Sequence, residues 1–281
     1  MYKKISIIGT GLIGGSLGLL SKKIFPDTTL NAVDKSSVIA DLPDDSPFDE
    51  VFNSNEISDA IANSDLVFLC LPISSIVELL PKVMSEAKQG AVICDVGSVK
   101  EPILNEAEKH PVPGVYFIGG HPIGGSEGHG FGDASAEILN GVKFIVSPAS
   151  NVPEEVIKKH TDFLTKLNFQ VVEMNPAVHD HAVAYTSHLP QFISTALALS
   201  IGEVEKIELT AGRGLSSMTR LASSPPGIWN DIIRYNGDEL TEAISVFSSL
   251  LSELENDIRD GSISAKFGAA ADLSGRIRGD K

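Results

Sequence analysis

The stretch KISIIGTGLIGGS, residues 4–16, decides how the rest of the chain is interpreted. A short isoleucine-rich run leads into three glycines with the spacing G-x-G-x-x-G. Where a strand turns into a helix, the first glycine permits the tight turn, the second lets a pyrophosphate approach the backbone, and the third lets helix and strand pack closely. Free amide groups at the start of the helix then hold the phosphates. The stretch therefore predicts a dinucleotide-binding turn, with cofactor-binding residues Gly9, Gly11, Leu12, Ile13 and Gly14.

Asp34 ends the next predicted strand, LNAVD, about 20 residues beyond the last glycine of the turn. A carboxylate at this place can accept hydrogen bonds from both ribose hydroxyls, and it would repel a 2′-phosphate. The sequence therefore favours NAD over NADP as the cofactor. Lys35 follows directly and weakens that preference.

Outward from the turn, short β-branched runs alternate with helix-like stretches as far as FQVVEM, residues 169–174. This alternation indicates crossover units that feed a parallel sheet. From about His179 onward the pattern is helical only, and HDHAVAYTSHLPQFISTALALSIG is apolar, small or hydroxylic on most sides. A small helical domain cannot bury such a helix alone, so dimerisation is expected. We predict an α/β Rossmann-type parallel sheet domain over residues 1–174 and an all-α dimerisation domain over residues 175–281.

Composition narrows the class of partner. The 281 residues carry a net charge of −15 and are 42% hydrophobic. So acidic a chain is not expected to bind nucleic acid or an anionic membrane, because phosphate recognition needs clustered lysine and arginine. No apolar run reaches the roughly 20 residues of a membrane span, and the N-terminus does not have the pattern of a signal peptide. Cys70 and Cys94 lie in apolar runs, as thiols of a reducing compartment do. We expect a cytoplasmic protein with a small-molecule substrate.

Three successive predicted strands end in residues suited to a ligand site. Leu71 and Pro72 follow LVFLC, Ser98 follows AVICDVG, and His121 ends VYFIGG and opens the glycine-rich run HPIGGSEGHGF. In an open parallel sheet, ligands lie against the carboxyl ends of the strands. Histidine titrates near neutrality, so His121 could remove a hydroxyl proton while hydride leaves the same carbon for a nicotinamide. For Ser98 a helix-capping role is an equal alternative.

Three histidines, His179, His181 and His188, lie close together in the sequence. The first two are two positions apart and point in different directions on a helix. His181 and His188 could share a face, but no third ligand accompanies them. The pattern favours packing and hydrogen bonding over a metal site, and no metal is predicted. His129, within the glycine-rich run, is either a loop residue or part of a gate.

Several motifs in order along nearly the whole chain resemble the prephenate dehydrogenase family of tyrosine biosynthesis. They are GTGLIGGS with Asp34, DVGSVK, HPIGGSEGHG, His179 and Asp180 followed by SHLP, and MTRLASSPPGIWNDI. The resemblance implies NAD-dependent oxidative decarboxylation of prephenate to 4-hydroxyphenylpyruvate, or of arogenate to tyrosine. It also implies a Rossmann domain followed by a helical dimerisation domain, and hence a homodimer.

The same resemblance assigns roles to individual residues. It implies that His121 bonds the ring hydroxyl and promotes its deprotonation, and that Ser98 orients both. Substrate-binding positions are assigned to Ser126, His188, Gln191 and Arg220. A planar guanidinium suits the binding of a carboxylate, although Arg220 could instead be a surface salt-bridge partner.

Two departures from the family pattern bear on the substrate. Many members that use prephenate read SHLPH, and this chain has Gln191 in place of the last histidine, which leaves the choice between keto acid and amino acid open. Ser216, Ser217 and Met218 replace the residues that often precede the Thr-Arg pair.

Two other functions remain open. A hydroxy-acid dehydrogenase or imine reductase usually has a lysine on its helical domain, and none occurs between residues 179 and 200. A dinucleotide-sensing protein without turnover would have no use for the combination of Ser98, His121 and Arg220.

Overall fold

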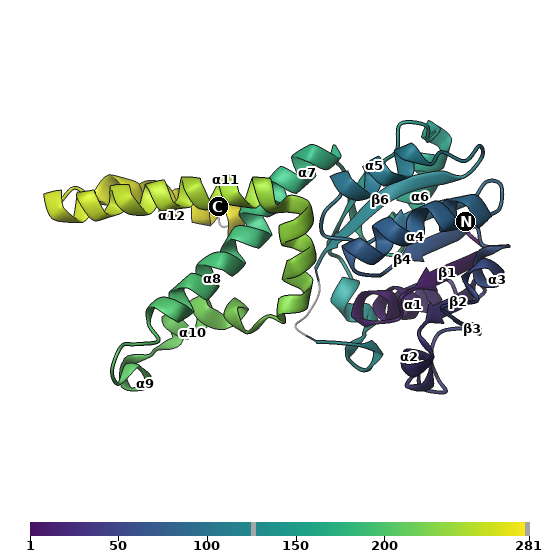
Figure 1. Cartoon of the computed structure of the whole chain (residues 1–281), viewed down its shortest axis with the longest axis horizontal. Coiled ribbons are helices and arrows are strands. Elements are labelled where there is room, and N and C mark those ends of the chain that lie inside the picture. Colours follow the sequence, from purple (N-terminus) through teal and green to yellow (C-terminus); the bar gives the residue numbers. More distant parts are fainter. Residues whose placement is uncertain (125–127, 279–281) are drawn as a thin grey trace.

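The computed structural model describes residues 1–124 and 128–278, and it has two parts (Figure 1). A sheet flanked by helices forms the first, and an extended group of helices that projects away from it forms the second. The sheet contains eight strands in the order β3-β2-β1-β4-β5-β6-β7-β8. Their bounds are β1 Lys4–Ile8, β2 Thr29–Asp34, β3 Glu50–Asn53, β4 Leu66–Leu69, β5 Val92–Asp95, β6 Tyr116–Ile123, β7 Lys143–Pro148 and β8 Gln170–Glu173.

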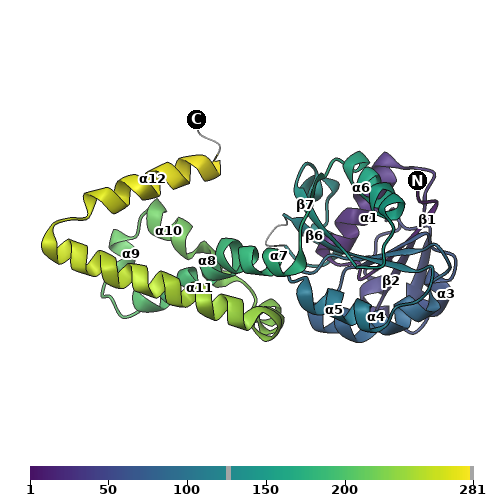
Figure 2. The ribbon, with the colours of Figure 1, turned by 90° about the horizontal axis from the view of Figure 1, so that it is seen from above.

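Six helices connect these strands. They are α1 Leu12–Ile24, α2 Ser36–Ala40, α3 Ile57–Ile61, α4 Ile73–Glu86, α5 Glu101–Lys109 and α6 Glu154–Lys166. Figure 2 shows α1 and α6 on one face of the sheet and α4 and α5 on the other. The strand order from β3 to β6 is that of the doubly wound dinucleotide-binding fold. The Rossmann-type prediction is thereby confirmed.

The sheet differs from a fully parallel one at a single point. Strands β1 to β6 run parallel, but β7 pairs antiparallel with β6, with His121 opposite Ile145. Between them the described chain forms only two short 3-10 turns, η1 Phe131–Asp133 and η2 Ala136–Leu139. A parallel neighbour needs a crossover, usually a helix, whereas antiparallel strands do not. The connection that contains the glycine-rich run therefore reverses the chain.

The second part begins at α7, Pro176–Val183, where the Asn175 side chain accepts hydrogen bonds from the backbone of Ala177 and Val178. A π-helical turn, η3 Ala184–His188, leads into α8 Leu189–Ser200. The remaining elements are α9 Ile207–Thr210, α10 Arg213–Thr219, η4 Arg220–Ser223, α11 Pro226–Asp260 and α12 Ser264–Arg278. Within residues 1–124 and 128–278, no helix is both long and apolar enough to cross a membrane.

Helix α11 bends at Asn236, whose φ of −135° is not helical. The Asn236 side chain is buried, and its amide nitrogen donates a 2.9 Å hydrogen bond to the carbonyl oxygen of Asp180 in α7. The bend therefore lies where α11 is bonded to the first helix of the second part.

Candidate active site

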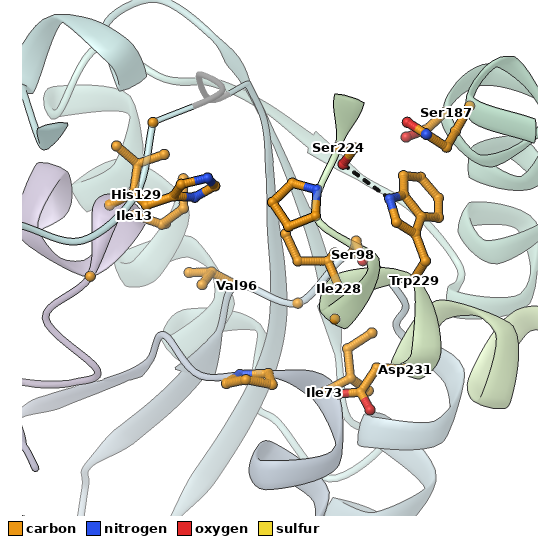
Figure 3. A pocket seen from close by; sticks show the side chains of 18 of the residues that line it. Ile13, Ile73, Val96, Ser98, His129, Ser187, Ser224, Ile228, Trp229 and Asp231 are labelled. Carbon is orange, nitrogen blue, oxygen red and sulfur yellow. Dashed lines mark hydrogen bonds between the residues drawn. The ribbon is translucent and has the colours of Figure 1, made fainter. Parts of the chain in front are cut away.

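A cleft of about 1270 Å³ lies between the carboxyl ends of the strands and the helical part. Both parts supply its walls, as Figure 3 shows with Ile13, Val96 and Ser98 from the sheet part and Ser187, Trp229 and Asp231 from the helical part. Eight of the predicted site residues line it: Gly11, Leu12, Ile13, Leu71, Pro72, Ser98, Gln191 and Arg220.

The glycine turn has the geometry that its spacing predicts. Gly9 adopts a φ of +93°, which disfavours any residue with a side chain, and a Cβ there would overlap the carbonyl oxygen of Cys70. A Cβ at Gly14 would overlap the carbonyl oxygen of Gly9, so helix α1 can pack here only without one. Gly11 has no heavy atom within 4 Å of where a Cβ would be. The chain thus leaves open space at the glycine where a ligand would approach.

Helix α1 begins directly after this turn, and its N-cap, Gly11, makes no side-chain capping bond. The free amide groups at the helix N-terminus and the open space beside Gly11 together fit the pyrophosphate of a dinucleotide.

Asp34 ends β2 beside the turn. Its Oδ2 accepts hydrogen bonds from the backbone nitrogen of Thr10 at 2.7 Å and from its hydroxyl at 3.0 Å. The other oxygen accepts a 2.8 Å bond from the backbone of Lys35. Asp34 is not among the residues that line the cleft, and these bonds tie the glycine turn to the end of β2.

His121 lies in β6 and starts a chain of hydrogen bonds. Its Nδ1 is 2.8 Å from Nε2 of His179, and Nδ1 of His179 is 2.7 Å from Oδ1 of Asp180. His179 and Asp180 are almost completely buried. His121 itself does not line the cleft, but Ser98 at the end of the neighbouring strand and Gly124 directly after β6 do. The predicted proton acceptor is therefore held from the helical part.

Asp180 also binds the start of helix α5. Its two oxygens accept bonds from the backbone nitrogens of Lys100 at 2.7 Å and Glu101 at 2.8 Å. The N-cap of α5 is Lys100, which makes no side-chain capping bond. The sequence allows helix capping as an alternative role for Ser98. In the structure, Asp180 from the second part of the chain caps α5 instead.

A buried ion pair lies close to His121. The Lys100 ammonium contacts the Asp95 carboxylate and donates a 2.6 Å bond to the carbonyl oxygen of Gly120, and both charged side chains are completely buried. Burial lowers the pKa of His121 well below its usual value, and the positive charge of the neighbouring Lys100 lowers it further. His121 is therefore neutral at neutral pH and can accept a proton.

Two predicted substrate residues are bonded or buried in ways that the sequence does not reveal. The Gln191 amide nitrogen donates a 2.8 Å bond to the carbonyl oxygen of Leu221, so this side chain holds the turn that follows Arg220. His188 is buried against Trp229 and does not line the cleft. Burial is the main cause that lowers the pKa of His188 to about 4. Its position agrees with the packing that the sequence favours for it.

The three neighbouring histidines do not converge. His179 bonds His121, His188 packs in the interior, and His181 is exposed with Nδ1 2.7 Å from Glu239. Over residues 1–124 and 128–278, no three His, Cys, Asp or Glu side chains are grouped so as to hold a metal ion. Ser126, the remaining predicted substrate residue, lies outside the described residues.

A second aspartate of the helical part caps a helix of the sheet part. Asp231, in α11, accepts bonds from the backbone nitrogen and the hydroxyl of Ser74, both at 2.9 Å. Helix α4 has Pro72 as its N-cap, with no capping side chain of its own. Asp231 also lines the cleft (Figure 3), so the joint between the two parts lies at the site itself.

Two family models match the chain in succession. Residues 22–173 match the prephenate dehydrogenase nucleotide-binding domain, and residues 175–267 match the prephenate dehydrogenase dimerization domain. The chain belongs to the prephenate dehydrogenase family. It is thus a dehydrogenase of the prephenate and arogenate dehydrogenase group, and the family prediction is confirmed.

Relatives of this dehydrogenase bear names with different substrates. The cyclohexadienyl dehydrogenase of Zymomonas mobilis is 29% identical over 263 residues, which are 92% of this chain and 89% of that protein. The structure of Synechocystis arogenate dehydrogenase is 26% identical, with a TM-score of 0.80 over 99% of this chain and 98% of that one. Prephenate dehydrogenase from A. aeolicus, solved with hydroxyphenyl propionate and NAD+, shares the fold at 24% identity and a TM-score of 0.88 over 99% and 98% of the two chains.

Proposed function

We propose that this dehydrogenase oxidatively decarboxylates prephenate to 4-hydroxyphenylpyruvate, with NAD as hydride acceptor. One observation carries the proposal: a neutral His121, bonded to His179, lies in the strand that pairs with β5, and Ser98, which follows β5, lines the same cleft as Gly11 of the glycine turn. The cleft exceeds the roughly 300–1,000 Å³ of a pocket for one drug-sized ligand. A dinucleotide and a small substrate can therefore occupy it together.

The sheet part supplies the residues that would hold NAD. The turn from Gly9 to Gly14, with Leu12 and Ile13 at the start of α1, would bind the pyrophosphate, and Leu71 and Pro72 would contact the rest of the cofactor. Asp34, bonded to Thr10, would accept the ribose hydroxyls and exclude a 2′-phosphate. When bound, NAD supplies an acceptor for the hydride of the substrate ring.

Residues of both parts would bind and orient the substrate and accept its proton. His121 would take the proton of the ring hydroxyl, Ser98 would orient that hydroxyl, and Arg220 would bind a substrate carboxylate with its planar fork. Loss of the ring carboxylate as carbon dioxide leaves an aromatic ring, and this aromatisation drives the reaction forward. Ser126, His188 and Gln191 stay in the proposal as the remaining substrate residues, His188 acting from behind the cleft wall.

Arogenate is the second candidate substrate. It carries an ammonium group where prephenate has a keto group, and the described cleft offers the neutral Gln191 and the carboxylate of Asp231 on its helical side. A carboxylate favours a nearby ammonium. The relatives named for arogenate and for both substrates support keeping this candidate.

The helical part supports a homodimer as the working form. Large apolar side chains are exposed along α11 and α12, among them Leu251, Ile258, Phe267 and Ile277. Residues 175–267 match the dimerization domain of the family. We therefore propose residues 1–174 as the cofactor-binding unit and residues 175–281 as the unit that pairs two copies and completes the substrate site.

The test is NADH formation from NAD, with prephenate and arogenate offered separately, and the same assays repeated with NADP. Turnover of prephenate supports the leading proposal. Turnover of arogenate alone would replace it by the second candidate, and a preference for NADP would contradict the role given to Asp34. Absence of turnover with both substrates would overturn the proposed function.

A further inference from the structure

The hydrogen-bond chain that ends at His121 starts from a group that can only accept. Ionised Asp180 has no proton to give, and its two oxygens already accept the backbone N–H groups of Lys100 and Glu101 at the N-terminus of α5. Such an arrangement binds a carboxylate as an anion. The 2.7 Å contact from Nδ1 of His179 to Oδ1 of Asp180 therefore requires that Nδ1 of His179 carry the proton.

This requirement passes to the next ring. A neutral imidazole has one donor and one acceptor nitrogen, so Nε2 of His179 is an acceptor once Nδ1 donates. Its partner at 2.8 Å is Nδ1 of His121, which must then donate. The rings meet edge to face, with 79° between their planes and 5.1 Å between their centroids. In neutral His121 the single ring proton is thus on Nδ1, and Nε2 keeps its lone pair.

We infer that His179 and Asp180 are positioning residues for the dehydrogenation. Asp180 fixes the proton of His179 on Nδ1, His179 thereby fixes that of His121 on Nδ1, and Nε2 of His121 is the atom that accepts the hydroxyl proton of the substrate. In that step the O–H bond breaks and an Nε2–H bond forms, while the Nδ1–H bond to His179 remains. This inference rests on the proposed function for the identity of the substrate.

This relay, the hydrogen-bonded series His121, His179 and Asp180, also couples the two parts of the chain. His121 belongs to β6, whereas His179 and Asp180 belong to α7, and Asp180 can reach α5 only while α7 lies against it. The positive charge that His121 gains on accepting a proton is then offset through His179 by the buried Asp180 carboxylate. Only the docked arrangement of the two parts provides the proton acceptor in its working form.

Two replacements of His179 separate positioning from packing. In His179→Gln, the side-chain carbonyl can still accept the Nδ1–H of His121, whereas His179→Leu keeps the bulk without an acceptor. We expect His179→Leu to lower kcat by about 10²-fold, the usual scale for loss of a general base, with an unchanged KM for NAD. His179→Gln should recover kcat to within about tenfold of the native value. His181→Leu, an exposed position on the same helix, is the matched control and should leave kcat unchanged.

A second measurement reads the ring protons directly and needs no substrate. We expect ¹⁵N spectra of the histidine-labelled full-length protein to show His121 with a protonated Nδ1 and an unprotonated Nε2, with His121→Asn used to assign the signals. His179→Leu should shift this population towards the Nε2–H form, and His179→Gln should not.

The outcomes separate this inference from the proposed function. A native His121 protonated on Nε2, or full kcat in His179→Leu, would overturn the relay even if prephenate is turned over. The expected ring protons without turnover of either substrate would leave the relay standing and remove the proposed function. If His179→Leu fails to fold, the spectra of the native protein and of His179→Gln still show which nitrogen of His121 carries the proton.

Discussion

The sheet part and the helical part differ most in how far each buries its own apolar side chains. One continuous core runs through the sheet part and includes Tyr2, Phe68, Phe117 and Phe163. Among the described residues of the helical part, 175–278, the separate cluster is small, with the buried residues Ala184, Leu189 and Ala243. The sheet part buries most of its large apolar side chains within itself, whereas the helical part exposes apolar surface that a second copy would cover. The glycine turn and His121 thus belong to the well-packed part, and the exposed apolar surface that the proposed pairing would cover belongs to the other.

The largest effect that tests this division is expected in the sheet part. Replacing His121 by Asn should lower kcat by about 10²-fold or more, because the proton acceptor is lost. The affinity for NAD should stay within about twofold, since the glycine turn is untouched. Steady-state kinetics and calorimetric titration with NAD check both. His110→Asn, exposed at the end of α5, is the control, and undiminished kcat in His121→Asn would contradict the role of His121.

In the helical part, two charges on the exposed apolar face of α11 should affect assembly rather than fold. Leu251 and Ile258 lie seven positions apart on one side of the helix, 51% and 68% exposed. Replacing both by Glu should weaken self-association by about 10²-fold or more, because unpaired charges would be buried. Sedimentation over a range of concentrations measures it. The variant Ser252→Glu with Asn256→Glu adds the same charge on another side, and equal dissociation of both variants would argue against this face.

Two glycines of one turn should separate folding from cofactor binding. Gly14→Ala places a Cβ into the carbonyl oxygen of Gly9 and should cost about 1–3 kcal/mol of stability. Gly11→Ala meets nothing within 4 Å and should keep the native stability while weakening NAD about tenfold, because the Cβ occupies the approach of the pyrophosphate. Thermal unfolding with and without NAD distinguishes them. Equal NAD affinity in Gly11→Ala and the native protein would place the pyrophosphate elsewhere.

At the joint between the parts, a smaller effect is expected from Asp231→Ala. The two bonds from Ser74 would be lost, leaving the start of α4 uncapped, which typically costs about 0.5–2 kcal/mol. Thermal unfolding gives the change. Asp238→Ala, further along α11, serves as the comparison, and equal unfolding temperatures for the two variants would show that the cap contributes nothing.

The smallest effect is a shift in pH dependence. Burial and the positive charge of Lys100 lower the pKa of His121, so its neutral, proton-accepting form persists to lower pH than that of an ordinary histidine. The acidic limb of kcat/KM should therefore lie below pH 6.5. A limb at or above that value would mean that another group controls activity on the acid side.

Much of the fold and part of the candidate site could be predicted from local sequence patterns. The glycine turn, the alternation of strands and helices, and the placement of Leu71, Ser98 and His121 near strand ends all follow from residues close together in the sequence. The antiparallel β7 was not predicted, because the glycine-rich run before it shows no period that separates a crossover from a reversal.

The bonds that join the two parts could not be predicted. Asp180 and Lys100 are 80 positions apart, and Asp231 and Ser74 are 157 apart. An aspartate that caps another helix looks in the sequence like any polar residue of its own helix. The absence of a capping side chain before α4 and α5 was the available signal, since the residues there are Pro72 and Lys100.

The bend at Asn236 gives helix α11 two arms with different surroundings. The short arm carries Trp229 and Asp231 into the cleft, and the long arm carries the exposed apolar face. Because Asn236 is buried and bonded to α7, the angle between the arms is fixed by the interior and not by a loop. In a homodimer paired through the long arms, each α11 would connect the dimer interface to its own cleft. The distance between the two clefts would then depend on the bend angle at Asn236.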